Sequence, residues 1–167
     1  MLVNDEAVID PVCGMRVGPD DRVVEYRGMR FAFCSEQCRE RFRTHPGLYV
    51  GSPGAPAPRQ RGEVRRRRRH LRLEAPLGEA QARAVVAHLR RLMGIEDVRV
   101  QGADVLITYD LLQVSLEDIE NALGEAGARL GDAWTDRLRR GFVQFVEDWE
   151  LHAMDGDGGG SGGAHCH

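Results

Sequence analysis

The spacing of apolar and polar residues predicts a small α+β module at the start of the 167-residue chain. Two alternating segments, residues 23–26 and 29–33, predict strands that are joined by a tight two-residue turn. Ser35 is a residue type favoured at the start of helices, and it predicts a helix that ends near Thr44. The pattern therefore favours a hairpin and one helix over about residues 8–50, with few apolar residues for a core.

A second domain is predicted between about residues 68 and 130. Its elements follow the order strand, helix, strand, strand, helix, at residues 70–73, 82–93, 98–100, 105–108 and 115–127. This order predicts a ferredoxin-like βαββα(β) sandwich. Only residues 128–130 remain for its final strand.

The last predicted element is an amphipathic helix over residues 131–154. Its large side chains recur every three or four positions and form one stripe: Trp134, Leu138, Phe142, Phe145, Trp149 and His152. We expect the stripe to pack against the second domain, and the alternatives are self-association into a homo-oligomer or contact with another protein. His152, like His88 on an earlier helix, is expected to be a packed side chain and not a ligand.

Residues 51–67 are rich in proline, glycine and arginine, which predicts a flexible linker. The run Arg65–Arg69 could bind phosphates, but the formal net charge of the chain is −3 and no aromatic residues interleave with the run. We therefore expect the run to be the solvated end of the linker, leading into a strand. Nucleic acid is not an expected partner.

The composition limits the class of protein. The chain contains no stretch of 18 apolar residues and no apolar signal segment at its start, so we expect no membrane span and a cytoplasmic protein whose thiols are reduced. All 23 basic residues are arginine. No paired carboxylates, nucleophile with a base or glycine-rich phosphate loop is recognisable, so an enzyme is not expected.

Three of the four cysteines, Cys13, Cys34 and Cys38, lie in the first module with the spacing Cys-x20-Cys-x3-Cys. If Ser35 begins a helix, Cys34 and Cys38 share one face about 6 Å apart, near a positively polarised end that favours thiolates. A thiolate cluster of this kind suits copper(I) or zinc(II). Buried structural cysteines or a disulfide are the alternatives.

The end of the chain, residues 155–167, is a glycine-rich segment that finishes in His165-Cys166-His167. These three side chains are possible ligands for a soft or borderline metal ion. We expect the tail to capture metal or to complete the coordination of an ion held elsewhere, and the alternative is an incidental tail.

Several motif blocks in the first module occur in a characteristic order: Asp10-Pro11-Val12-Cys13-Gly14-Met15, Tyr26–Phe31, Phe33-Cys34-Ser35-x-x-Cys38, Phe42 and His45-Pro46-Gly47-Leu48-Tyr49. In this order they resemble the YHS domain, one of the TRASH-type group of small metal-binding modules. The resemblance implies a treble-clef-like fold, metal binding by the three cysteines, and a role in heavy-metal trafficking, buffering, resistance or sensing. Met15, His45 or the tail could supply a fourth ligand, and copper(I) could be held by three sulfurs.

The second domain, including its segment Leu92–Val100, resembles the heavy-metal-associated domain of copper chaperones and metal-transporting P-type ATPases. The Cys-x-x-Cys motif of that family would fall near Gly78 and Gln81, and neither residue is cysteine. The resemblance therefore implies docking or scaffolding and not metal transfer by this domain. It favours a metal-transporting P-type ATPase or another metal-handling protein as partner, with a zinc-stabilised interaction adaptor as the alternative.

Overall fold

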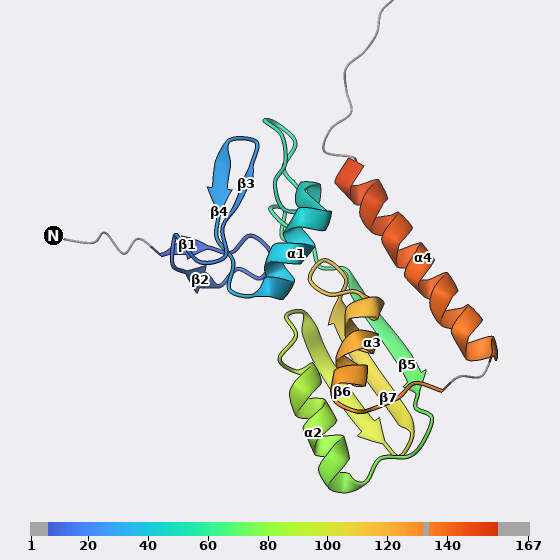
Figure 1. The fold of residues 1–167 in the computed structure, drawn as a ribbon. Helices are drawn as coiled ribbons and strands as arrows, with labels where there is room; N and C mark the ends of the chain where they lie inside the picture. The colour runs from blue at the N-terminus through green and yellow to red at the C-terminus, as the bar shows by residue number, and fades with distance from the viewer. Residues whose placement is uncertain (1–6, 132–133, 157–167) are drawn as a thin grey trace, which may run out of the picture.

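The structure is a computed structural model that describes residues 7–131 and 134–156 (Figure 1). It combines helices with three small sheets and is an α+β protein. The first module contains β1 (Val8–Ile9), β2 (Arg16–Val17), β3 (Val24–Tyr26), β4 (Met29–Phe31), α1 (Glu36–Thr44) and the 3-10 turn η1 (Pro46–Leu48). The second part contains β5 (Arg66–Arg72), α2 (Glu79–Leu89), β6 (Ile95–Gln101), β7 (Asp104–Asp110), α3 (Leu116–Glu125) and α4 (Trp134–Gly156).

The predicted hairpin and helix of the first module are confirmed. β3 and β4 pair in antiparallel fashion, and the turn residues Arg27 and Gly28 both have positive φ, 51° and 73°. Such a turn matches the right-handed twist of the strands. Ser35 caps α1, with its hydroxyl accepting a hydrogen bond from the Cys38 N–H. Because these features depend on neighbouring residues, the local sequence was sufficient to predict them.

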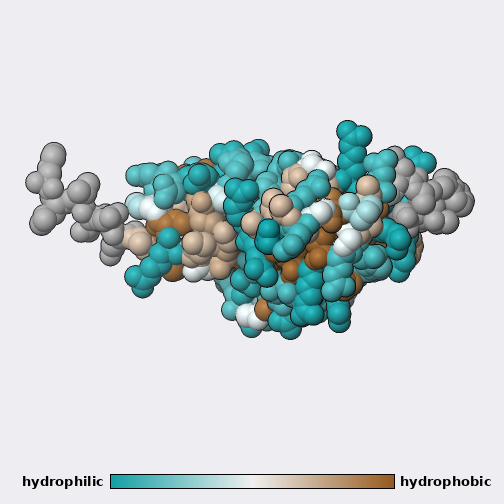
Figure 2. All heavy atoms as spheres, turned by 90° about the horizontal axis from the view of Figure 1, so that it is seen from below, coloured by the Kyte–Doolittle hydropathy of each residue, from teal (hydrophilic) through white to brown (hydrophobic). Residues whose placement is uncertain are grey.

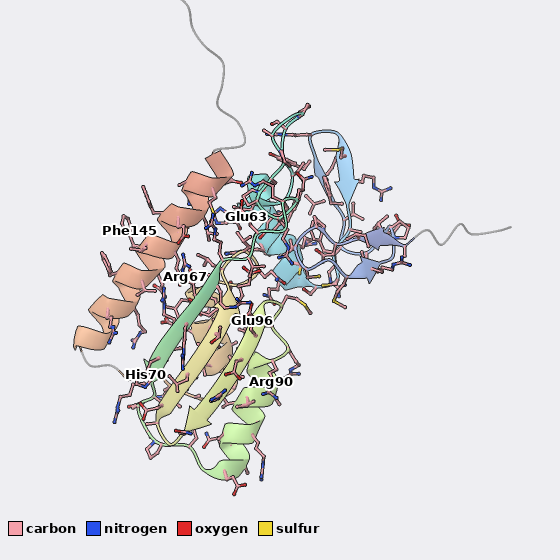
Figure 3. The ribbon with its side chains drawn as sticks, turned by 180° about the vertical axis from the view of Figure 1, so that it is seen from behind. Glu63, Arg67, His70, Arg90, Glu96 and Phe145 are labelled. Atoms are coloured by element: carbon pink, nitrogen blue, oxygen red, sulfur yellow. The ribbon has the colours of Figure 1, made fainter. Side chains whose placement is uncertain are left out.

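The second part has the predicted order of elements. Its sheet is antiparallel with the strand order β5-β7-β6, and α2 and α3 lie on one face of it (Figures 1 and 3). The helix predicted over 82–93 is shifted: α2 begins at Glu79, directly after Gly78, and a turn at Arg90 ends it. The segment predicted as a final strand makes a single bridge, between Leu73 and Leu130.

The arginine run differs from the prediction, because β5 begins at Arg66 and not after the run. Alternate side chains of a strand point to opposite faces. Arg67 and Arg69 are half-buried and pair with Glu150 and Glu147 of α4, whereas Arg66 and Arg68 are exposed. Figure 3 shows Arg67 on the strand that runs beside α4. The run is therefore mainly part of the sheet, and two of its five arginines pair with α4.

The segment predicted as a flexible linker follows a defined path before β5. The Gln60 side-chain oxygen accepts hydrogen bonds from the main-chain N–H groups of Gly51 (3.0 Å) and Ala57 (2.8 Å). The Arg59 N–H donates to the Leu48 carbonyl at 2.9 Å. A Cβ at Gly51 would lie 2.2 Å from the Ala55 oxygen, so only glycine allows this close approach. These contacts hold the segment against the first module.

The orientation of α4 corrects the expectation that its aromatic stripe packs on the second domain. Phe142, Phe145 and Trp149 are 67–68% exposed, and Phe145 projects from the outer side of the helix (Figure 3). The buried side instead presents Glu147 and Leu151, each 2% exposed. The side chains of Trp134 and Leu138 lie outside the described part of the structure.

A polar group explains this orientation. The Glu147 carboxylate accepts hydrogen bonds from the Tyr109 hydroxyl, from Arg69 at 3.2 Å and from the Leu116 N–H at 3.0 Å. A buried carboxylate needs such partners. These polar contacts, and not the apolar stripe, therefore determine which face of α4 is buried. The two predicted packed histidines differ: His152 is exposed, whereas His88 is half-buried and lies 3.4 Å from Glu125.

Buried apolar residues of both parts of the chain form one continuous cluster, from Val12 to Leu151. The surface seen from below is mainly hydrophilic, with hydrophobic residues between the polar ones (Figure 2). Polar contacts also join the parts, since the Gln37 side-chain amide donates to the Met93 and Gln113 carbonyls and accepts from the Met93 N–H. None of the helices in the described part of the chain is long and apolar enough to cross a membrane.

Candidate metal centre

The three cysteines of the first module come together at one place in the structure. Cys13 lies in the turn between β1 and β2, Cys34 directly precedes the cap of α1, and Cys38 lies in the first turn of that helix. The Cys13 and Cys34 sulfurs are 3.4 Å apart, and the Cys34 and Cys38 sulfurs are 3.6 Å apart. All three are free thiols.

These distances suit a shared metal ion. Four ligands placed tetrahedrally with bonds of about 2.3 Å to sulfur lie about 3.8 Å from one another, so the thiols need to move only a few tenths of an ångström. Cys13 and Cys34 are half-buried and Cys38 is buried, so a side of the cluster stays open to solvent. The group can bind an ion that enters and leaves from that side.

Asp10 joins the three thiols and was not identified as a functional residue from the sequence. Its carboxylate is buried and accepts hydrogen bonds from the main-chain N–H groups of Val12 (2.8 Å), Cys13 (3.4 Å) and Cys34 (2.9 Å). One side chain thereby connects the two segments that carry the first two thiols. Asp10, Cys13, Cys34 and Cys38 together form a group whose possible ligand atoms all lie within 4.8 Å of one another.

The role of Asp10 is mainly to position the thiols, because both of its oxygens already accept main-chain N–H groups. An aspartate that bonds the N–H two residues later is a common turn former, and the Asp10-Pro11 pair before a Cys-Gly turn was the available signal in the sequence. That Asp10 also bonds Cys34, 24 positions away, could not be read from local sequence.

The proton affinities of the thiols are unequal. The hydrogen bond with Cys38 lowers the pKa of the Cys13 thiol to about 7. Burial raises the pKa of the Cys34 thiol to about 11, and the hydrogen bond with Cys13, followed by burial, raises the pKa of Cys38. In the metal-free cluster, burial and the hydrogen bonds with Cys13 therefore oppose the ionisation of Cys34 and Cys38, although both lie at the start of a helix. Cys13 is the thiol that ionises first.

Residues 8–52 match the YHS domain. The YHS segment contains all four members of the cysteine and aspartate cluster, and the match together with the cluster fits a metal-binding role. No curated protein and no solved structure gives a significant match to the chain.

The sequence offered Met15, His45 and the tail as candidates for a fourth ligand to the three thiols. Met15 follows the Cys13 turn and is 49% exposed. His45 lies away from the thiol group and forms part of a second group with two residues of α4. The tail residues His165, Cys166 and His167 lie outside the described part of the chain.

Proposed function

We propose that this chain is a heavy-metal-binding protein that holds copper(I) or zinc(II) through Cys13, Cys34 and Cys38. The observation that carries the proposal is the set of short sulfur–sulfur distances, 3.4 and 3.6 Å, maintained by the buried Asp10 carboxylate. Three thiolates are a ligand set that copper(I) and zinc(II) both accept. The proposed role is binding and not catalysis.

Transfer of the ion in trafficking, buffering, resistance or sensing would proceed by exchange of thiolates. The low pKa of Cys13 makes its sulfur the first to ligate at neutral pH, and the other two thiols release their protons as they bind. An incoming ligand can then reach the open side of the cluster and replace one sulfur at a time. This chemistry requires reduced thiols, as in the cytoplasm.

The second part of the chain is proposed to be a ferredoxin-like domain related to heavy-metal-associated domains and used for docking. The strand order β5-β7-β6 and the helices on one face of the sheet support this proposal. The proposed partner is a metal-transporting P-type ATPase, on which the chain acts in trans. Nuclear magnetic resonance titration with a soluble metal-binding domain of such an ATPase tests it; shifts confined to β5, β6 and β7 are expected, and an unchanged spectrum would contradict it.

Native mass spectrometry of the full chain in reducing buffer tests the main proposal, with copper(I) and zinc(II) added separately. We expect one bound ion to disappear in each of Cys13→Ser, Cys34→Ser and Cys38→Ser. Cys166→Ser is the matched control, because it also removes one thiol. It shows whether the bound ion depends on the tail or on the cluster. An unchanged ion count in all three cluster variants would overturn the proposal.

A second candidate function is a zinc-stabilised adaptor, which the exposed Phe142, Phe145 and Trp149 favour. In that case the metal stabilises residues 8–50 and the aromatic surface of α4 binds a protein, including a second copy of this chain. The rate of metal exchange separates the two candidates. Exchange within minutes supports transfer, whereas slow exchange with loss of the fold on chelation supports the adaptor.

A further inference from the structure

A second group of metal-ligating side chains lies where the end of α1 meets α4. It consists of His45, which follows α1, and of Asp148 and His152 on α4. One possible ligand atom from each residue lies within 4.8 Å of the others. We propose that these three side chains form a second metal site, separate from the thiols, for a divalent transition-metal ion of the zinc(II) class.

The two ligands on α4 have the spacing that a helix needs to hold one ion. Asp148 and His152 are four positions apart, so they lie on the same face one turn from each other. The His152 Nδ1 is 3.4 Å from the Asp148 carboxylate and 2.8 Å from the Asp148 main-chain oxygen. When Nδ1 donates to that main-chain oxygen, Nε2 carries the lone pair, an arrangement common among metal-bound histidines.

His45 provides an independent observation that points to a bound cation. Its side chain is 2% exposed, and its Nδ1 has no hydrogen-bond partner within residues 7–131 and 134–156. An unpaired buried nitrogen is costly, and a bound cation would satisfy it. The His45 and His152 rings are perpendicular, with centroids 4.9 Å apart, so the buried ring lies against the exposed one.

The charges around His45 also suit a cation. Burial and the nearby Arg41 lower the pKa of His45, which keeps the ring neutral and able to bind metal. Arg41 opposes a second positive charge, but Asp148 and Asp155 both act on His45 in the opposite sense. Asp155 is one turn beyond His152, and its buried Oδ1 has no hydrogen-bond partner among the described residues. Asp155 is not one of the three grouped side chains, so we assign it no ligand role.

The ligand set determines which ions fit. Two imidazoles and a carboxylate suit zinc(II), cobalt(II) and nickel(II), whereas copper(I) prefers the thiols. A cavity of about 420 Å³ between α1, α3 and α4 adjoins the site, and both His45 and Asp148 line it. An ion bound here would fasten α4 to the end of α1, so the two sites would differ in both chemistry and structural effect.

Cobalt(II) titration of the full chain in a weakly coordinating reductant distinguishes the two sites. Thiolate binding produces sulfur-to-cobalt charge-transfer absorption. Binding at the proposed site adds ligand-field absorption without charge transfer, and we call this the sulfur-free phase of the titration. We expect His152→Ala and Asp148→Asn, both at exposed positions, to weaken the sulfur-free phase by at least about tenfold and to leave the charge transfer unchanged. His45→Gln should have the same effect, but the conclusion rests on the two exposed variants.

His70→Ala is the matched control, because His70 is also an exposed histidine beside a carboxylate, 2.7 Å from Asp104. It should leave both phases unchanged. The double variant His165→Ala and His167→Ala should also retain the sulfur-free phase. Absence of that phase in the natural chain, its persistence in His152→Ala and Asp148→Asn, or its loss in the tail variant would overturn the proposal.

Discussion

At the scale of single residues, Asp10 determines the geometry of the thiol cluster. Its carboxylate replaces water for three main-chain N–H groups that would otherwise be buried without partners. The two segments that carry Cys13 and Cys34 are far apart in sequence and share no strand pairing. One buried carboxylate therefore connects these two segments where no strand pairing does.

We expect Asp10→Ala to weaken metal binding about 10- to 100-fold, as the loss of a residue that orients ligands commonly does. It should also lower the free energy of unfolding by about 2 kcal/mol, because the buried N–H groups lose their acceptor. Competition with a chelator and urea denaturation measure the two effects. Asp20→Ala removes an exposed carboxylate from the same module and is the control; equal effects of both changes would contradict the role of Asp10.

The unequal pKa values predict the order in which the metal-free thiols react. Cys13, with its pKa lowered to about 7, should be half ionised near neutral pH, and its alkylation by iodoacetamide should rise as the pH increases through that value. Cys34, with a pKa of about 11, should react only in strong alkali. Peptide mass spectrometry after timed alkylation measures both.

Cys38→Ser provides the internal check on this order. Because the Cys38 hydrogen bond is the largest cause of the low pKa of Cys13, its weakening should move the reactive pH of Cys13 upward. The same pH profile in the variant and the natural chain would show that another group stabilises the Cys13 thiolate.

At the scale of elements, α4 is positioned by charge and not by its largest apolar side chains. Glu147 bonds β7 through Tyr109, β5 through Arg69 and the start of α3 through the Leu116 N–H. A single helix side chain thus contacts three other elements. The arginine run belongs to the same arrangement, because the strand alternation turns Arg67 and Arg69 toward the helix.

We expect Glu147→Ala to lower the free energy of unfolding by about 3–5 kcal/mol, since it leaves Arg69 half-buried without its partner. Glu150→Ala should cost only about 0–1 kcal/mol, because the pair it forms with Arg67 is more exposed to solvent. Urea denaturation and proteolysis within α4 compare the two variants. Equal stability of both would mean that the apolar contacts of the helix, such as Leu151, hold it in place.

At the scale of the whole molecule, the first module is supported by the second part of the chain. Gln37 precedes the proposed ligand Cys38, and its side chain bonds the main chain of Met93 and Gln113. Arg41 and Tyr49 donate to the carbonyls of Leu111 and Leu112. The helix that carries one thiol is thereby attached to the loops on either side of the sheet hairpin.

We expect Gln37→Ala to destabilise the protein by about 1–3 kcal/mol, because it leaves main-chain groups at the junction without partners. It should also separate the unfolding of the two parts, so that one thermal transition becomes two. Differential scanning calorimetry measures this change, and Gln101→Ala, at an exposed glutamine, is the control. A single unshifted transition in Gln37→Ala would show that the shared apolar core alone couples the parts.

The sequence alone was enough to predict the elements that depend on neighbouring residues. The Arg27-Gly28 turn and the Ser35 cap are present where the local pattern indicates, and the helix predicted from residue 115 begins after Ser115, which forms a capping box with Asp118. The spacing of the three cysteines also predicted that they could act together. In each case the interacting groups lie within a few positions of one another or carry a chemistry that few other residue types share.

Only the tertiary structure revealed the buried carboxylates and the second histidine group. Arg69 and Glu147 are 78 positions apart, and Asp10 and Cys34 are 24 apart, so no local pattern could pair them. The face that α4 buries could not be predicted for the same reason. Its aromatic stripe was visible in the sequence, but the distant partners of Glu147 were not. Free energy gained between distant polar groups depends on where the whole chain brings them, and periodicity along one helix does not contain that information.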